Sequence, residues 1–157
     1  MALLTSLYLC SRTVYAAVGT PTGSGARVLA AAQTELPEGC LINGVITNEA
    51  DLTAALKEFF TANKLPMNHV ALIAGGSQFM HRILSLPAMS EKKRMAVLSH
   101  ELASGGAEVK APLDDYMLLS RDARTRVDTV LATRVEQSVI AGYDALAKAV
   151  GFKLYSI

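Results

Sequence analysis

The sequence is poor in the residues on which disulfide frameworks and zinc sites depend. It contains two cysteines, Cys10 and Cys40, and three histidines, with no CxxC pair and no Cys/His cluster. This spacing argues for neither a disulfide framework nor a zinc site, and it favours inert thiols in a reducing compartment. We therefore expect no metal and no cofactor.

Charge of one sign is also scarce. The chain has 15 Lys and Arg against 14 Asp and Glu, a formal net charge of +1, and 18% charged residues. Nucleic-acid binding needs a basic face that neutralises several phosphates, so we expect no nucleic-acid partner. The densest basic group, Lys92, Lys93 and Arg94, follows Glu91 and is interpreted as a solvated helix surface.

Long hydrophobic runs are absent as well. No stretch approaches the roughly 20 apolar residues of a membrane-spanning helix. The apolar segment 1–10 lacks the basic start of a signal peptide and is interrupted by Thr5, Ser6 and Tyr8. We interpret it as a buried strand and expect the chain to be cytoplasmic.

What the sequence does have is apolar material for a core. Of its 157 residues, 51% are hydrophobic, which suits one domain or a domain with a small subdomain. Periodicity and turn residues predict strands over 3–10, 13–18, 27–36, 40–47, 69–74, 79–86, 113–120, 126–133 and 152–157, and helices over 48–63, 90–104 and 135–150.

Three details of this pattern are specific enough to check. Asn48 is expected to cap the first helix, with Asp51 reaching back to it. The glycine-rich segment 19–25 is predicted to be a loop, and 69–74 a central strand buried on both faces. Gly105 and Gly106 are expected to close the second helix.

The order of these elements predicts an α/β fold with a mixed sheet. A three-strand meander followed by alternating helix and strand is not the order of a doubly wound parallel sheet. The β-α-β-β unit over 75–133 is predicted to be an insertion into a domain made by 1–74 and 134–157.

Four phrases of the sequence match a known family in order and spacing: LPEGCLINGVI at 36–46, FMHRILSLPAMS at 79–90, LDDY at 113–116 and AVGFK at 149–153. Together they resemble the N-terminal half of the actin-like PilM family of type IV pilus assembly proteins. The chain is more distantly similar to the cytoplasmic GspL-type proteins of type II secretion and to the division protein FtsA. The resemblance implies an actin-like, RNase H-like subdomain 1A (1–74 and 134–157) with an inserted subdomain 1C (75–133), without the second actin-like domain.

The resemblance also implies a function. A PilM-like or GspL-like chain is expected to be a non-catalytic scaffold of a type IV pilus or type II secretion platform. Its expected partners are inner-membrane platform proteins and a secretion-type ATPase, at the cytoplasmic face of the bacterial inner membrane. A homodimer is left open, as is a membrane helix or a second domain after Ile157.

The nucleotide site of actin-like proteins has a degenerate counterpart here. The family binds MgATP at the first hairpin through an Asp and a Gly, and these positions fall at Tyr8 and Cys10, followed by Ser11. A phenol does not replace a carboxylate around Mg²⁺, and a Cβ obstructs the approach that Gly permits. We therefore expect no enzyme activity; the alternative is a fragment of a nucleotide-binding actin-like ATPase.

Other catalytic patterns are incomplete. Segment 19–25 lacks the Gly-Lys-Ser/Thr ending of a P-loop. His100 and Glu101 begin a metalloprotease pattern, but Ser104 stands where the second His is required. An unrelated small-molecule-binding domain is the third alternative.

The insertion carries the expected partner site. Along 79–86 both faces of the strand have large apolar side chains, and residues 116–119 repeat the pattern. Packing against the main domain explains this as well as a peptide groove does. The groove hypothesis takes Met80 and Leu84 as anchors, Arg82 at the rim and Tyr116 from the repeated pattern. It predicts that Leu84→Asp abolishes binding without unfolding.

Overall fold

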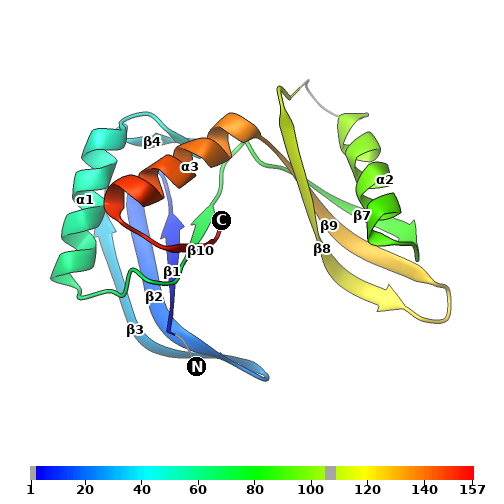
Figure 1. Cartoon of the computed structure of the whole chain (residues 1–157), viewed down its shortest axis with the longest axis horizontal. Helices are drawn as coiled ribbons and strands as arrows, with labels where there is room; N and C mark the ends of the chain where they lie inside the picture. The colour runs from blue at the N-terminus through cyan, green and yellow to red at the C-terminus, as the bar shows by residue number, and fades with distance from the viewer. Residues whose placement is uncertain (1–2, 105–108) are drawn as a thin grey trace. The chain divides into compact units, whose positions relative to one another are not determined.

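The computed structural model describes residues 3–104 and 109–157. These divide into two compact units, each built around its own sheet (Figure 1). Unit 1 comprises Met1–Ser77 and Ser138–Ile157, and unit 2 comprises Gln78–Gln137. The boundaries expected from the sequence for the insertion were 75–133.

Unit 1 is built on a five-stranded mixed sheet in the order β10-β6-β1-β2-β3. β1, β2 and β3 form an antiparallel meander, whereas β6 runs parallel to β1 and β10 parallel to β6. This mixed sheet confirms the predicted fold class. The strands are β1 (Leu4–Leu9), β2 (Thr13–Thr22), β3 (Gly25–Glu35), β6 (Val70–Ala74) and β10 (Leu154–Ser156), and a separate small hairpin is formed by β4 (Leu41–Ile42) and β5 (Val45–Ile46).

One face of this sheet is covered by α1 (Glu49–Ala62) and by α3 (Gln137–Val150), which lie across the strands in Figure 1. Alternation along β1 explains why only one face is covered: Leu7 and Leu9 are buried, whereas Tyr8 between them is exposed. The buried side chains that meet in this layer are Leu7, Leu9, Val14, Leu52, Leu56, Phe59, Phe60, Tyr143, Leu146 and Phe152. Burying each such residue contributes about 1.5–3 kcal/mol.

The predicted cap of α1 is confirmed. The Asn48 side chain accepts a hydrogen bond from the Asp51 amide at 3.2 Å, and its amide group donates to the Asp51 carboxylate at 2.7 Å. The helix ends at Asn63, whose side chain donates to the Phe59 carbonyl. Both ends of α1 are therefore closed by side chains close in sequence.

Unit 1 contains a point where two backbone segments touch. The turn at Asn43 and Gly44 meets Gly75 and Gly76, which follow β6. A Cβ on Gly76 would lie 2.3 Å from the Asn43 carbonyl oxygen, and the φ of Gly76 is +143°. The buried Tyr143 hydroxyl donates to the Gly44 carbonyl at 2.9 Å, so α3 is tied to the same turn. Only glycine fits at Gly76.

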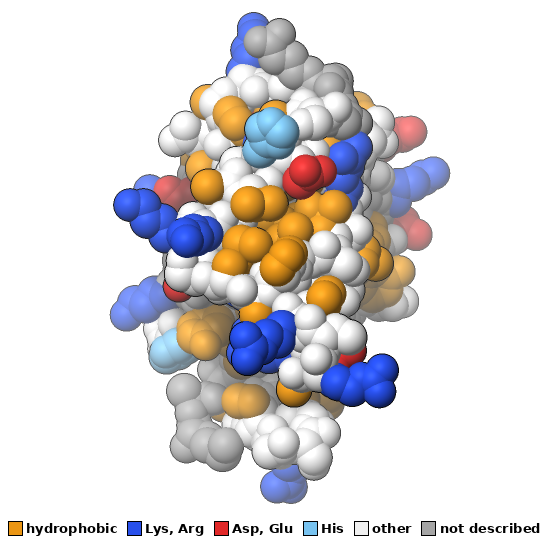
Figure 2. Space-filling view, turned by 90° about the vertical axis from the view of Figure 1, so that its right-hand side faces the viewer, with side chains coloured by type: hydrophobic (Ala, Val, Ile, Leu, Met, Phe, Trp, Pro, Cys, Tyr) orange, Lys and Arg blue, Asp and Glu red, His pale blue; other side chains and the backbone are white. Residues whose placement is uncertain are grey.

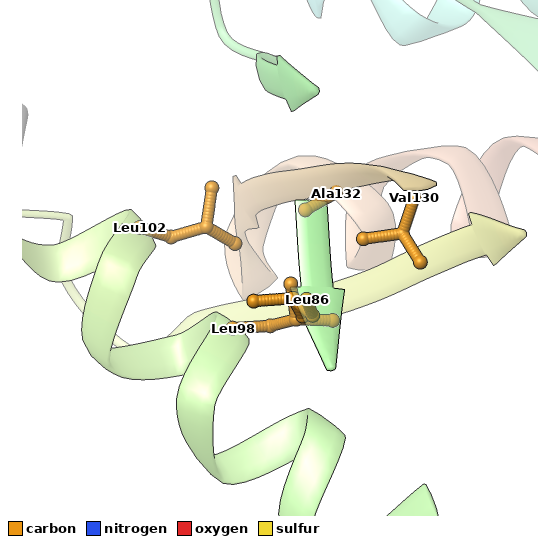
Figure 3. Packing of buried hydrophobic residues seen from close by; sticks show 5 residues of the cluster. All are labelled: Leu86, Leu98, Leu102, Val130 and Ala132. Carbon is orange, nitrogen blue, oxygen red and sulfur yellow. The ribbon is translucent and has the colours of Figure 1, made fainter. Parts of the chain in front are cut away.

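Unit 2 is a three-stranded antiparallel sheet in the order β7-β9-β8, covered on one face by a single helix. Its buried apolar cluster comes from the helix and the two strands β7 and β9, and consists of Leu86, Leu98, Leu102, Val130 and Ala132 (Figure 3). The elements are β7 (Met80–Pro87), α2 (Glu91–Ala103), β8 (Pro112–Asp122) and β9 (Val127–Glu136).

Ion pairs flank this cluster. The Asp128 carboxylate is fully buried and accepts hydrogen bonds from Arg94 at 2.5 Å and from Arg121 at 2.9 Å. At the other end of β9, Arg134 donates to Asp114 at 2.7 Å. Hydrogen bonding by Arg121 lowers the pKa of Asp128, and hydrogen bonding by Arg134 lowers the pKa of Asp114, so both carboxylates stay ionised.

Three expectations about elements need correction. Segment 19–25 is not a loop, because β2 runs to Thr22 and β3 starts at Gly25. β6 is not buried on both faces, since Ile73 is 49% exposed on the side that the helices leave uncovered. Val135, expected on the last helix, lies in β9 instead, and α3 begins at Gln137. The expected closure of α2 at Gly105 and Gly106 lies outside the described residues.

Candidate partner-binding surfaces

The first hairpin of unit 1 places Tyr8 and Cys10 close together. Tyr8 stacks on Tyr15 across the β1–β2 pair, with ring centroids 6.2 Å apart and planes 22° apart. A side-chain hydrogen bond with Cys10 raises the pKa of the Tyr8 phenol. The Cys10 amide donates to the Thr13 carbonyl at 2.9 Å within the hairpin, and Ser11 is exposed at the turn.

That arrangement is unlike a phosphate cradle. Such cradles depend on backbone N–H groups that point at the ligand, and the Cys10 N–H is engaged within the hairpin. The phenol of Tyr8 lies flat against Tyr15 and carries no negative charge at neutral pH. The hairpin therefore presents an aromatic surface.

Over the described part of the chain, no three His, Cys, Asp or Glu side chains are grouped to hold a metal ion. His100 and Glu101 lie on α2, and the Ser104 hydroxyl donates to the His100 carbonyl at 2.7 Å. This bond lies at the C-terminal end of the helix. Within residues 3–104 and 109–157 no helix has the length and apolar content to cross a membrane.

The four residues expected to bind a partner share one face of the unit 2 sheet, the face that α2 covers. Met80, Leu84 and Tyr116 pack against the buried cluster. Arg82 donates to the Glu101 carbonyl at 3.0 Å, and the Tyr116 hydroxyl accepts from Arg94 at 2.9 Å. Their role in partner binding stays a prediction. Leu84→Asp is now expected to disturb the packing of unit 2, because Leu84 touches its core.

The opposite face of the same sheet carries an exposed apolar row. Ile83 on β7 pairs with Leu131 on β9, which pairs with Met117 on β8. Ile83 is 67% exposed and Met117 is 59% exposed. We call these three residues the outer row. The alternation along 79–86 placed Ile83 and Leu84 on opposite faces of the strand. The sequence did not show which of the two faces is accessible, because that depends on which face the helix covers.

Unit 1 has a second accessible apolar surface on the sheet face away from α1 and α3. Tyr8 pairs with Tyr15 on one side and with Ile73 on the other, and small residues occupy the adjoining row. We call this surface the open face. It forms a depression of about 630 Å³, lined by Ser6, Tyr8, Tyr15, Ala16, Ala17, Ala31, Ala32, Gln33 and Ile73.

Figure 2 shows one side of the molecule in space-filling form. Hydrophobic side chains gather near the middle of this side, and Lys and Arg side chains lie around them. Large exposed apolar groups surrounded by polar ones are typical of surfaces that meet another molecule.

No protein-family model and no curated protein sequence matches this chain. Among solved structures, a chain of a PilM-PilN type IV pilus biogenesis complex superimposes with a TM-score of 0.83 at 16% sequence identity. The chain has a PilM-like, actin-like fold. The match covers 98% of this chain and 46% of the PilM-PilN chain, so this chain spans about half of that protein's length. At this level of identity the likeness establishes the fold, and the fold expected from the sequence is confirmed.

Proposed function

We propose that this chain is a non-catalytic scaffold of a type IV pilus or type II secretion platform at the cytoplasmic face of the bacterial inner membrane. The observation that carries the proposal is the match of nearly the whole chain to a chain of a pilus biogenesis complex. Its proposed partners are inner-membrane platform proteins and the assembly ATPase. A fold alone does not fix a function, so the surfaces must support the proposal independently.

The hairpin chemistry favours a scaffold over an ATPase. MgATP binding would require a carboxylate and close backbone approach where the chain has Tyr8 and Cys10. Aromatic stacking and the turn hydrogen bond occupy those groups. A thermal-shift titration with MgATP tests the alternative of a nucleotide-binding ATPase fragment. A saturable rise in melting temperature would favour that alternative over the scaffold proposal.

The outer row is the surface of unit 2 that we assign to partner contact. Ile83 and Met117 are exposed side by side around Leu131, and methionine adapts its shape to a partner. Packing this row against an apolar partner segment would remove large apolar groups from water. Met80 and Leu84 would then support the row from the other side of the sheet.

The test is an affinity purification of the full chain from detergent-solubilised cells of its own organism. Wild type is expected to retain platform subunits and a secretion-type ATPase. Ile83→Asp is expected to lose at least one of these partners, and Val28→Asp, at a similarly exposed β-branched residue of unit 1, is the matched control. Retention of a soluble ligand without any platform protein would overturn the proposal.

A further inference from the structure

One end of unit 2 brings together two segments that are distant in sequence. The pairing of β8 with β9 ends at Asp122 and Val127, and residues 123–126 make the turn between them. The Ala88 amide donates to the Arg126 carbonyl at 2.8 Å. The connection from β7 to α2, and with it the first turn of α2, therefore lies against the β8–β9 turn.

This end is basic although the chain as a whole is nearly neutral. Segments 88–94 and 120–128 contain six basic and three acidic residues, a net charge of +3 in a chain whose total is +1. The basic residues are Lys92, Lys93, Arg94, Arg121, Arg124 and Arg126, and the acidic ones are Glu91, Asp122 and Asp128.

One of the three carboxylates is buried, whereas Glu91 and Asp122 are exposed. Asp128 is fully buried between Arg94 and Arg121. Asp122 accepts hydrogen bonds from the amides of Arg124 and Thr125 inside the turn, at 2.8 and 3.2 Å. Apart from the group of Asp128 with Arg94 and Arg121, this end exposes four basic and two acidic side chains, so its outward charge stays positive.

Besides Arg121, which pairs with Asp128, four basic side chains lie at the surface of this end: Lys92, Lys93, Arg124 and Arg126. The N-terminus of α2 adds positive potential there, because the Ser90 side chain makes no capping hydrogen bond. We call these four residues the basic end. In the second half of β8, Leu118 and Leu119 are 41% and 47% exposed.

The shape of the basic end favours a flat partner over a peptide. Figure 1 shows the β8–β9 turn extending past the first turn of α2. A protruding turn with long cationic side chains can rest on an anionic layer, whereas an acidic peptide is usually held in a groove. The exposed Leu118 and Leu119 of β8 suit the boundary between headgroups and acyl chains.

We infer that the basic end of unit 2 is a contact site for the anionic phospholipid surface of a membrane. Clusters of four or more Lys and Arg bind such surfaces electrostatically, and each cation contributes about a five-fold gain in partition. The inference goes beyond the scaffold proposal, since it assigns a lipid contact to residues that the proposal does not use. Its test contains no other protein, so either proposal can fail while the other stands.

The test is co-sedimentation of the purified chain with phosphatidylglycerol/phosphatidylcholine vesicles and with pure phosphatidylcholine vesicles. We expect binding to the anionic vesicles alone, weakened at least ten-fold when salt rises from about 50 to 300 mM. The variant with Lys92→Gln, Lys93→Gln, Arg124→Gln and Arg126→Gln should lose at least about 50-fold in partition coefficient. Circular dichroism melting checks that it remains folded.

The matched control removes the same charge from unit 1. Arg12→Gln, Arg27→Gln, Lys57→Gln and Lys153→Gln also replace two Lys and two Arg, all exposed, and should change partition by less than about three-fold. Equal losses of partition coefficient in the two variants would show that vesicle binding depends only on the net charge of the chain, and would overturn the inference. The inference would also be overturned if inorganic phosphate, added at constant ionic strength, abolished the binding of the wild-type chain to vesicles. Binding to poly-glutamate without binding to vesicles would overturn it as well.

Discussion

The two units solve the problem of a stable core in different ways. Unit 1 buries a broad layer of aliphatic and aromatic side chains, and its buried Thr5 hydroxyl donates to the Pro66 carbonyl at 2.7 Å. Unit 2 buries five apolar residues in its cluster and flanks them with the ionised Arg94, Asp128 and Arg134. A small unit has little apolar surface to bury, so paired charges close the ends of its core. The comparison predicts that different changes break each unit.

The largest effect is expected where backbone meets backbone in unit 1. Gly76→Ala would place a Cβ 2.3 Å from the Asn43 carbonyl oxygen at a φ of +143°, so both strain and a clash oppose it. We expect the free energy of unfolding to fall by about 4 kcal/mol, measured by urea denaturation. Gly75→Ala is the control, because a Cβ there meets nothing within 4 Å. A loss of less than about 1 kcal/mol for Gly76→Ala would contradict the close contact between these two backbone segments.

The next effect concerns the small core of unit 2. Leu98 is fully buried in the cluster between α2 and the sheet (Figure 3), and Leu98→Ala leaves a cavity that few neighbours can fill. We expect a loss of about 3 kcal/mol, seen as faster amide exchange across unit 2 and little change in unit 1.

The matched control for Leu98→Ala is Ile83→Ala, on the exposed face of the same sheet, which should cost less than about 0.5 kcal/mol in the isolated chain. Equal acceleration of exchange in both units after Leu98→Ala would show that the units unfold together. The comparison between two separate cores would then fail.

The third largest effect expected is a difference between the two units in stability at acid pH. Hydrogen bonding to Arg121 and Arg134 lowers the pKa values of Asp128 and Asp114 in the folded state. Such groups contribute stability that is complete above the unfolded pKa of about 3.9 and is lost as pH falls through the folded values. Amide exchange followed from pH 6 to pH 2.5 should show unit 2 opening below about pH 4 while unit 1 stays protected. Simultaneous opening of both units would contradict this.

Much of the secondary structure could be predicted from the sequence, because the strongest sequence signals are local. The cap at Asn48 and the stripe of α1 follow from side chains within one or two turns of each other. The face that stays uncovered depends on contacts distant in sequence. β6 looks like a strand buried on both faces, yet Ile73 is exposed because α1 and α3 pack on the same side.

The candidate site was harder to predict for the same reason. Alternation separated Leu84 from Ile83, but only the position of α2 shows that Leu84 faces the core and Ile83 the solvent. The basic end could not be predicted from the sequence either. The interpretation of Lys92, Lys93 and Arg94 as a solvated helix surface is wrong for Arg94, which is buried against Asp128. The hydrogen bond from the Ala88 amide to the Arg126 carbonyl brings the β8–β9 turn beside the start of α2.

The smallest effect compares how the helices of the two units begin. Asn48 accepts a hydrogen bond from the Asp51 amide, whereas Ser90 occupies the same position before α2 without a side-chain capping bond. Asn48→Ala should therefore cost about 1 kcal/mol, and Ser90→Ala only a few tenths, both measured by urea denaturation. Equal costs would mean that Ser90 caps α2 in solution. Its N-terminal N–H groups would then contribute less positive potential to the basic end, and vesicle binding would depend on Lys92, Lys93, Arg124 and Arg126 alone.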